Sequence, residues 1–430
     1  MLKRHWKTLL VSSVIVILSG IIVALLIFMK NQPPEKRGIT ALIEIANMEA
    51  DSALWGVNFP NQYTTYLKTE TNNQRTTYGG SEPFSKLDED TRLVELFAGN
   101  PFSIDYKEDR GHRNALTDVR ETKRLNDKTP ASCYSCKTSD TPALWAEMGV
   151  ENFSATTFKD MSYRIDQPIG CANCHEANTM RLIVTNPALD EALKKQGKNW
   201  QSFTRQEMRT LVCANCHVEY YFQGDKKVLT FPWENGTHIE DIEQYYNDYG
   251  FSDWQHKTSG AAMIKIQHPE YEMFTAGSTH FNAGVACADC HMPYTRDGSA
   301  KFSSHDVKSP LFSPAQSCGT CHTDVNYVVE RVKIIQDSVH TTLLATEDAL
   351  VAAIQAISQA ASYASVDKAK LEEARKLHRA AQVRWDFVAA ENSMGFHNPE
   401  EALRILAAAT DLARQAQIKA IEAMNLQVSK

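Results

Sequence analysis

The chain has 430 residues, of which 43% are apolar and 23% are charged, a composition typical of a soluble globular protein with one large domain or two ordinary ones. Its formal charge of -7 and its short basic runs argue against nucleic acid as a partner, because phosphate binding needs clustered Lys and Arg. The mild excess of acidic residues mainly favours solubility.

The first predicted element is an apolar segment of 21 residues, Leu9 to Met29, which follows the basic residues Lys3, Arg4 and Lys7. It is longer than a typical secretory signal core and about long enough to cross a bilayer of roughly 30 Å. No small-x-small cleavage site follows it, so we expect residues 1–30 to be an uncleaved membrane anchor with a cytoplasmic N-terminus. A cleaved signal peptide is the alternative. Either way, the rest of the chain is expected on the outer face of the cytoplasmic membrane, in a periplasmic or extracytoplasmic position.

A polar tether with two adjacent prolines is expected at 31–50. The segment at 51–325 contains every cysteine and is rich in turn-forming residues. Short helices are predicted around 186–212 and 239–249. No alternating strand pattern persists along the segment, so we expect few and short strands.

All ten cysteines fall into five pairs of one spacing, Cys-x-x-Cys: Cys133/Cys136, Cys171/Cys174, Cys213/Cys216, Cys287/Cys290 and Cys318/Cys321. A histidine directly follows four of the pairs: His175, His217, His291 and His322. Cys-x-x-Cys-His attaches c-type haem, because both thiols bond the vinyl groups of one porphyrin edge and the next residue offers its imidazole to the iron. A zinc ribbon needs such pairs in couples, and a disulfide scaffold leaves the histidines unexplained, so haem is favoured over both. Haem rings, more than aliphatic side chains, are expected to fill the interior of the segment at 51–325.

The remaining pair is followed by a lysine, in the stretch Cys133-Tyr134-Ser135-Cys136-Lys137. An amine can ligate iron when burial and the metal hold it deprotonated. A different ligand would set the electronics of this haem apart from the other four, so we interpret it as the haem reserved for chemistry. The alternative is that this lysine has no role at the iron and that a remote ligand replaces it.

The histidines outside the motifs indicate how the other axial positions are filled. Low-spin electron-transfer haems need a second axial ligand, so four further histidines are expected over the four histidine-ligated haems. Beyond the N-terminal flank, nine are available: His112, His238, His256, His268, His280, His305, His340, His378 and His397. Four of these lie in short polar segments that can reach over a haem: His112, His280, His305 and His397. His340 and His378 fit helical patterns and are expected to be structural, and for any single histidine a surface or hydrogen-bonded role is the alternative.

The segment at 326–430 has long helical patterns. Apolar residues recur at spacings of three, four or seven along one helix face: Val328, Val332, Ile335, Val339, Leu343, Leu350, Ile354 and Ile357. A second helix is predicted at 367–391, and Asn398-Pro399 predicts the start of a third helix that ends near residue 426. The expected fold class is therefore mainly α: a multihaem cytochrome with a turn-rich haem-binding core, long C-terminal helices and few short strands.

One Cys-x-x-Cys-Lys motif followed by four Cys-x-x-Cys-His motifs resembles the ammonia-forming cytochrome c nitrite reductases, a family of pentahaem c-type cytochromes. The likeness runs from about residue 50 to residue 425 and includes the stretches RGHRNALTDVRETKR, CHVEYYF, FPWENG and KIQHPEYE. The resemblance implies five covalently attached haem c groups, a calcium ion, and the six-electron reduction of nitrite to ammonium at a Lys-ligated haem fed by four bis-His haems.

The resemblance also implies a catalytic haem on the motif that ends in Lys137, with its distal face open to substrate. Three residues are implied around that face: Arg124, Tyr220 and His268. The choice of Arg124 over Arg113 and Arg120 depends on alignment of the surrounding motif.

Two further residue sets are implied by the same resemblance. The distal haem ligands are His112 on the His217 haem, His305 on the His175 haem, His280 on the His322 haem and His397 on the His291 haem. The calcium ligands are the side chains of Glu219 and Gln267 and the backbone carbonyls of Tyr220 and Lys265. Calcium prefers such oxygen donors.

The leading hypothesis is a nitrite reductase that receives electrons from a membrane-bound quinol-oxidising multihaem cytochrome. The family uses its long C-terminal helices for dimerisation, so a homodimer is expected and nucleic acid is not. A multihaem reductase acting mainly on hydroxylamine or sulfite is the second hypothesis, and a pure electron conduit with five six-coordinate haems is the third. Ammonium release from nitrite separates the first two, and a high-spin haem excludes the conduit.

Overall fold

A computed structural model describes residues 2–31 and 41–424 of the chain. The chain forms two compact units, Met1–Glu44 and Ile45–Lys430. Residues 32–40 of the predicted tether lie outside the described residues, and so does the predicted end of the last helix near residue 426.

The first unit contains the described helix α1 (Leu2–Asn31). Its described side chains, at Trp6 and at 10–23, are all exposed. Within the part of the chain that the structure describes, no helix is both long and apolar enough to cross a membrane. The division of the chain into anchor, tether and two further segments stays a prediction.

The second unit is mainly helical, and most of its helices are short. Those before the C-terminal segment are α2 (Ser52–Asn58), α3 (Pro60–Thr71), α4 (Lys86–Glu89), α5 (Arg92–Leu96), α6 (Ala115–Glu121), α7 (Thr141–Met148), α8 (Val150–Ala155), α9 (Phe158–Met161), α10 (Pro187–Lys195), α11 (Arg205–Leu211), α12 (Ile239–Asp248), α13 (Glu270–Thr275), α14 (Thr279–Asn282), α15 (Cys287–His291) and α16 (Pro314–Ser317). The helices predicted around 186–212 and 239–249 are found as α10, α11 and α12.

The strands of the described residues form three separate antiparallel pairs. They are β1 (Tyr221–Gln223) with β2 (Val228–Thr230), β3 (Trp254–Gln255) with β4 (Ala262–Met263), and β5 (Tyr294–Asp297) with β6 (Ala300–Ser303). The predicted fold class, mainly α with few short strands, is confirmed.

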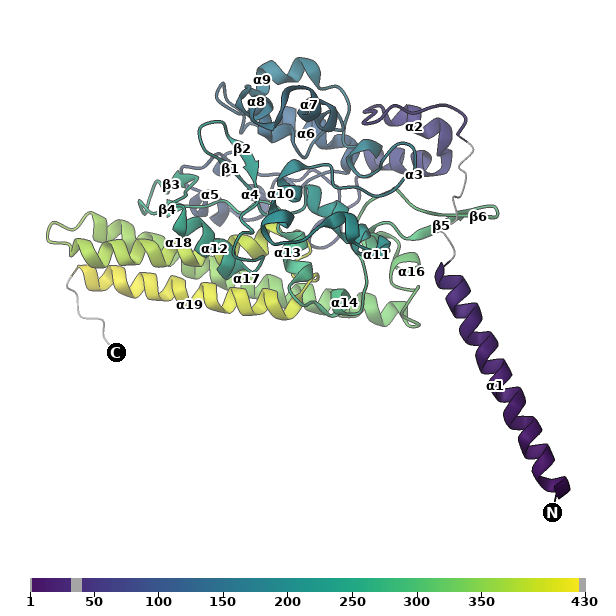
Figure 1. Ribbon diagram of the computed structural model, residues 1–430. Helices are drawn as coiled ribbons and strands as arrows, with labels where there is room; N and C mark the ends of the chain where they lie inside the picture. Colours follow the sequence, from purple (N-terminus) through teal and green to yellow (C-terminus); the bar gives the residue numbers. More distant parts are fainter. Residues whose placement is uncertain (1, 32–40, 425–430) are drawn as a thin grey trace. The chain divides into compact units, whose positions relative to one another are not determined.

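Three long helices, α17 (Val325–Ala361), α18 (Lys368–Ala390) and α19 (Pro399–Ala423), lie side by side (Figure 1). The predicted apolar face of α17 is buried from Val332 onward except at Ile335, which is half-buried. The side chain of Asn398 accepts a hydrogen bond from the backbone N–H of Glu401, and proline follows it at the first helical position. The third predicted helix therefore begins where its cap indicates.

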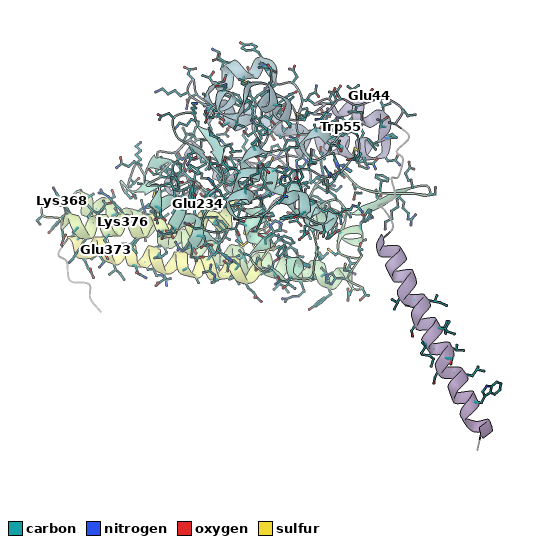
Figure 2. The ribbon with its side chains drawn as sticks, in the orientation of Figure 1. Glu44, Trp55, Glu234, Lys368, Glu373 and Lys376 are labelled. Atoms are coloured by element: carbon teal, nitrogen blue, oxygen red, sulfur yellow. The ribbon has the colours of Figure 1, made fainter. Side chains whose placement is uncertain are left out.

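The helix α18 has one buried and one charged face. Leu371 and Ala374 are buried, whereas Lys368, Glu373 and Lys376, labelled in Figure 2, are exposed. This spacing follows the helical period of 3.6 residues, so the helix can cover the core with one face and meet water with the other.

One apolar core joins the long helices to the segment before them. The long helices contribute Val339, Leu350, Trp385 and Leu406, and the earlier segment contributes Leu96, Phe97, Tyr246 and Ile266, among others. Asp386 of α18 adds polar links, because it accepts hydrogen bonds from the ammonium of Lys265 at 2.9 Å and from the backbone N–H of Ile266 at 2.8 Å. The long helices thereby hold the segment that carries two of the predicted calcium ligands, Lys265 and Gln267.

Candidate haem-binding and catalytic site

Each cysteine motif lies on a tight helical turn. The turns at Ala131–Tyr134, Cys171–Asn173 and Val212–Asn215 are 3-10 helices, and the fourth motif forms α15. The backbone N–H of the histidine after the second cysteine bonds the carbonyl of the first cysteine, at 3.0 Å for His175. This local fold brings both thiols and the following side chain to one turn, as attachment to a single porphyrin requires.

The fifth motif makes the same turn but is more exposed than the other four. The backbone N–H of His322 bonds the carbonyl of Cys318 at 2.9 Å, as in the other motifs. However, Cys321 is exposed, whereas the other nine cysteines are half-buried, and the ring of His322 is exposed as well. The turn of this motif ends just before α17 begins, and Cys318, at its start, is half-buried. The assignment of Cys321 as an attachment residue stays a prediction.

The two alternatives to haem attachment find no support among these turns. All ten cysteines are free thiols, so the disulfide scaffold is absent. Among the residues that the structure describes, no three or more Cys, His, Asp or Glu side chains are grouped to hold a metal ion, so there is no zinc ribbon.

The structure brings together the four histidine pairs that the resemblance implied. The ring centres are 6.5 Å apart for His112 and His217, 6.2 Å for His175 and His305, 6.4 Å for His280 and His322, and 6.3 Å for His291 and His397. An imidazole nitrogen binds a metal at about 2 Å, so two rings on opposite faces of one iron have centres roughly 6 Å apart. The separations therefore fit one iron between the rings of each pair.

Hydrogen bonds at Nδ1 orient several of these rings. The Nδ1 atom lies 3.0 Å from the Met180 carbonyl in His175, 3.0 Å from the Lys308 carbonyl in His291, 3.0 Å from the Ser303 carbonyl in His305, and 2.9 Å from Glu391 Oε2 in His397. Since these oxygens accept, Nδ1 carries the proton and Nε2 keeps its lone pair. Metal-ligating histidines characteristically have such a partner on the second nitrogen.

Burial also favours the form of histidine that binds a metal. It lowers the pKa of His112, His291 and His305 to about 4 each. These rings are therefore neutral near pH 7, and only neutral imidazole can ligate a metal.

Neighbouring motifs lie in contact through their cysteines. The thiols of Cys136 and Cys216 are hydrogen-bonded neighbours, and so are those of Cys213 and Cys287. The Lys137 motif thus adjoins the His217 motif, which adjoins the His291 motif. Groups attached to these thiols would be close enough to form a relay.

Polar groups with no partner gather around the Lys137 motif. No described residue forms a hydrogen bond or ion pair with the Lys137 ammonium, with the terminal nitrogens of Arg124, or with the Tyr220 hydroxyl. Burial raises the pKa of the Cys133 thiol to about 11, against the opposing charges of Arg124 and Lys137. These charges therefore act on the same attachment site.

His268 completes this group. Its Nδ1 atom is buried with no hydrogen-bond partner in the described chain, and it lies 3.7 Å from Glu270 Oε1. Its Nε2 atom lies 3.9 Å from Asp109 Oδ2. Asp109 is exposed, and the charges of Lys137 and His268 hold its pKa below its ordinary value, so both act on the same carboxylate.

The three candidate arginines differ in what they bind. Arg113 pairs with Glu70 at 2.9 Å, and Arg120 donates to the carbonyl of Ile165 at 2.6 Å. Arg124 uses only its Nε atom, toward Thr122, so its terminal nitrogens have no partner among the described residues. Arg113 is thus already paired with a carboxylate, whereas Arg124 makes no ion pair with a described residue.

The predicted calcium ligands form a second polar group beside Tyr220. Glu219 is completely buried, and its two oxygens accept hydrogen bonds from Tyr246 Oη at 2.7 Å and from the backbone N–H of Gln267 at 2.6 Å. The Gln267 amide lies 2.9 Å from the Lys265 carbonyl. Burial raises the pKa of Glu219 well above its ordinary value, and a cation would compensate the cost of its charge. The oxygen-rich donor set fits calcium.

Comparison with known proteins identifies the family. The family described as cytochrome c552 matches residues 51–428. The chain belongs to the cytochrome c552 family. It is 40% identical over 387 residues to cytochrome c-552 of Parabacteroides distasonis, covering 87% of this chain and 77% of that protein. It is 38% identical over 415 residues to cytochrome c nitrite reductase subunit NrfA of Nitratidesulfovibrio vulgaris, covering 86% and 78%.

A solved structure supports the same family. Cytochrome c nitrite reductase from Desulfovibrio desulfuricans has a TM-score of 0.85 and 37% identity, and the match covers 89% of this chain and 88% of that one. The description of that structure refers to two calcium sites in its catalytic subunit. The resemblance to the nitrite reductases that the motifs predicted is confirmed at the level of the family, and so is the mainly helical fold.

Sequence reasoning missed several residues that orient the predicted ligands. Glu391 contacts His397, and Glu270 lies 3.6 Å from His217 Nδ1 as well as close to His268. Neither glutamate belongs to a motif with a recognisable spacing. Glu270 follows His268 by two residues in KIQHPEYE, which was the one available signal.

Proposed function

We propose that the protein reduces nitrite to ammonium at a c-type haem attached to Cys133 and Cys136 and ligated by Lys137. The observation that carries this proposal is the contrast between the lysine motif and the other four. Each histidine motif has a second histidine facing it. The lysine motif instead has Arg124, Tyr220 and His268 near it, and His268 Nδ1 has no hydrogen-bond partner among the described residues.

The other four haems are assigned two histidines each. Their proximal ligands are His175, His217, His291 and His322, and the distal ligands in the same order are His305, His112, His397 and His280. Five haems bound in this way would relay the six electrons that nitrite reduction to ammonium consumes from an external donor, which side chains cannot do. The adjacent cysteines of neighbouring motifs support short transfer distances.

The side chains of the pocket bind the anion and supply protons. Arg124 presents two terminal NH2 groups, which suit the two oxygens of nitrite and stabilise negative charge on a departing oxygen. His268 and Tyr220 donate hydrogen bonds and pass protons to those oxygens as the N–O bonds break. The overall reaction takes up eight protons and releases ammonium and two waters.

Calcium is proposed at the side chains of Glu219 and Gln267 with the carbonyls of Tyr220 and Lys265. Two of these donors, the Glu219 carboxylate and the Tyr220 carbonyl, lie at consecutive residues. A bound cation would therefore hold the backbone that carries the Tyr220 phenol, which links calcium to the geometry of the pocket.

The position in the cell and the partners are proposed from the sequence and the family. The apolar run Leu9–Met29 and the c-type motifs support export to the outer face of the cytoplasmic membrane. We propose that the run remains as an anchor, which N-terminal sequencing of the membrane fraction tests. A membrane-bound quinol-oxidising multihaem cytochrome is the proposed donor, and the long C-terminal helices are the proposed homodimer contact.

Purified haem-loaded protein tests the reaction. With reduced methyl viologen as donor and nitrite as substrate, we expect ammonium as the product. Ammonium absent with nitrite, together with faster turnover of hydroxylamine or sulfite, would favour the related reductase. Five six-coordinate low-spin haems and no reductase activity would favour the electron conduit.

A further inference from the structure

Arg124 is held by a chain of hydrogen bonds that begins in a different segment. Its Nε–H donates to Thr122 Oγ1 at 3.0 Å, and the Thr122 hydroxyl donates to Asp105 Oδ2 at 2.7 Å. The same carboxylate oxygen accepts the backbone N–H of Lys123 at 2.8 Å. Asp105 thereby fixes both the backbone and the hydroxyl that precede the arginine.

The direction of these bonds is set by chemistry. A guanidinium only donates, so the Thr122 oxygen must accept from Arg124, and the single hydroxyl proton is then free to go to Asp105. Burial acts to raise the pKa of Asp105, but the hydrogen bonds from Thr122 and Lys123 hold it below its ordinary value. The carboxylate is therefore charged near pH 7 and keeps the hydroxyl turned toward it.

An aromatic ring fixes the plane of the same guanidinium. The Arg124 Cζ atom lies 4.1 Å from the centre of the Phe102 ring. The backbone N–H of Phe102 donates to the Asn100 side chain at 3.0 Å, which holds the turn that carries the ring. Arg124 is thus restrained at its Nε edge and on one face, while its two terminal nitrogens remain open.

We infer that Asp105 and Thr122 are positioning residues that aim Arg124 at the bound anion, with Phe102 fixing the plane of the guanidinium. The inference rests on the proposed nitrite reduction. Nitrite is small and offers few contacts, so its orientation depends on where the guanidinium fork lies. A misplacement of about 1 Å can lower a rate by roughly a hundredfold.

The test compares Thr122→Val, which keeps the shape and removes the hydroxyl, with Thr122→Ser, which keeps the hydroxyl. For Thr122→Val we expect the KM for nitrite to rise about tenfold or more and kcat/KM to fall accordingly, as for loss of a charge-assisted hydrogen bond. Thr122→Ser should stay within about threefold of the wild type. Arg124→Lys serves as the reference, because it keeps the charge and removes the guanidinium group.

Hydroxylamine distinguishes positioning from a general structural effect. Hydroxylamine is uncharged at neutral pH, so its binding does not depend on the orientation of the guanidinium. Thr122→Val should therefore retain wild-type turnover of hydroxylamine and a full set of haems. Equal losses with nitrite and hydroxylamine would overturn the inference, and so would an unchanged KM for nitrite. If Thr122→Val does not load haem, Asp105→Asn takes its place with the same expected split.

The wild-type protein separates this inference from the function on which it rests. If the wild type forms no ammonium from nitrite, the proposed function fails and the inference falls with it. If the wild type is active and Arg124→Lys is impaired while Thr122→Val and Asp105→Asn behave as wild type, only the positioning role fails.

Discussion

Glu391 Oε2 lies 2.9 Å from His397 Nδ1, and the side chain of Glu391 is 0% exposed. The carboxylate also accepts hydrogen bonds from the Ser393 hydroxyl at 2.7 Å and from the backbone N–H of Gly395 at 2.6 Å. These donors compensate the burial of a charge. An anionic partner on Nδ1 makes the opposite nitrogen a stronger donor to a metal.

Glu391→Gln should therefore raise the reduction potential of one haem, the one assigned to His291 and His397. A neutral amide leaves His397 a weaker donor, so the oxidised iron loses stabilisation relative to the reduced iron. Redox titration followed by absorbance measures the shift. Glu400→Gln, at an exposed position nearby, is the matched control and should leave all potentials unchanged. Identical titrations of Glu391→Gln and wild type would contradict the ligand assignment of His397.

Lys137→Ala should leave four low-spin haems and remove ammonium formation from nitrite. The substitution deletes the proposed fifth ligand of one iron and leaves the four histidine pairs intact. Lys137→His, which completes a fifth Cys-x-x-Cys-His motif, is the matched variant and should restore a fifth ligand to that iron, with reduced activity. Electron paramagnetic resonance and an ammonium assay are the measurements. Full activity in Lys137→Ala would refute the role of the lysine.

Chelation of calcium should lower nitrite reduction at least about tenfold, and added calcium should restore it. Glu219→Gln retains an acceptor for Tyr246 but loses the charge that a divalent cation needs. Elemental analysis should find less calcium in this variant, with the haem count unchanged. Glu240→Gln, at an exposed salt bridge, is the control. Normal calcium content in Glu219→Gln would show that the ion is bound elsewhere.

The buried carboxyl group of Glu347 should make the free energy of unfolding depend on pH, independently of the haems. Its side chain is 2% exposed, and burial raises its pKa from 4.5 to about 9. Arg92 lies 2.8 Å from Glu347 but also 2.5 Å from Asp90, and hydrogen bonds from Arg92 and Glu347 lower the pKa of Asp90 to about 2 against the effect of burial. We therefore place the negative charge on Asp90 and the proton on Glu347.

At pH values between 4.5 and about 9, Glu347 holds a proton in the folded chain and releases it in the unfolded chain. The free energy of unfolding should fall as the pH rises from about 4.5 to about 9, by up to about 1.4 kcal/mol per pH unit. Glu347→Gln should flatten this slope in denaturant titrations, while exposed Glu330→Gln should not. A slope retained in full by Glu347→Gln would contradict the buried proton.

The long helices could be predicted closely because their information is local. The apolar spacing along α17 and the Asn398-Pro399 cap of α19 are properties of neighbouring residues. Such patterns do not show where one helix ends and the next begins, as the segment 186–212 illustrates. Gly197 adopts a positive φ of 70° just after α10, and the chain then makes a 3-10 turn before α11 begins.

The site was predictable only where a motif carries it. The cysteine turns follow from spacing, but spacing does not tell how deep a turn lies, so the exposure of Cys321 could not be foreseen. The four histidine pairs followed from the family resemblance, since their members are far apart in the chain. The partners that orient the site were not predictable. Asp105 lies 17 residues from Thr122, and Glu391 reaches His397 through a turn whose backbone path no periodicity indicates.

Isotope-labelled nitrite gives the most direct test of the central claim. Haem-loaded wild-type protein with a reduced viologen donor should convert the label to ammonium in equal amount, consuming six electrons for each nitrite, while Lys137→Ala with its four low-spin haems should not. Label that remains as nitrite or appears only as nitric oxide in the wild type, or label that reaches ammonium at the full rate without the lysine, would contradict the account.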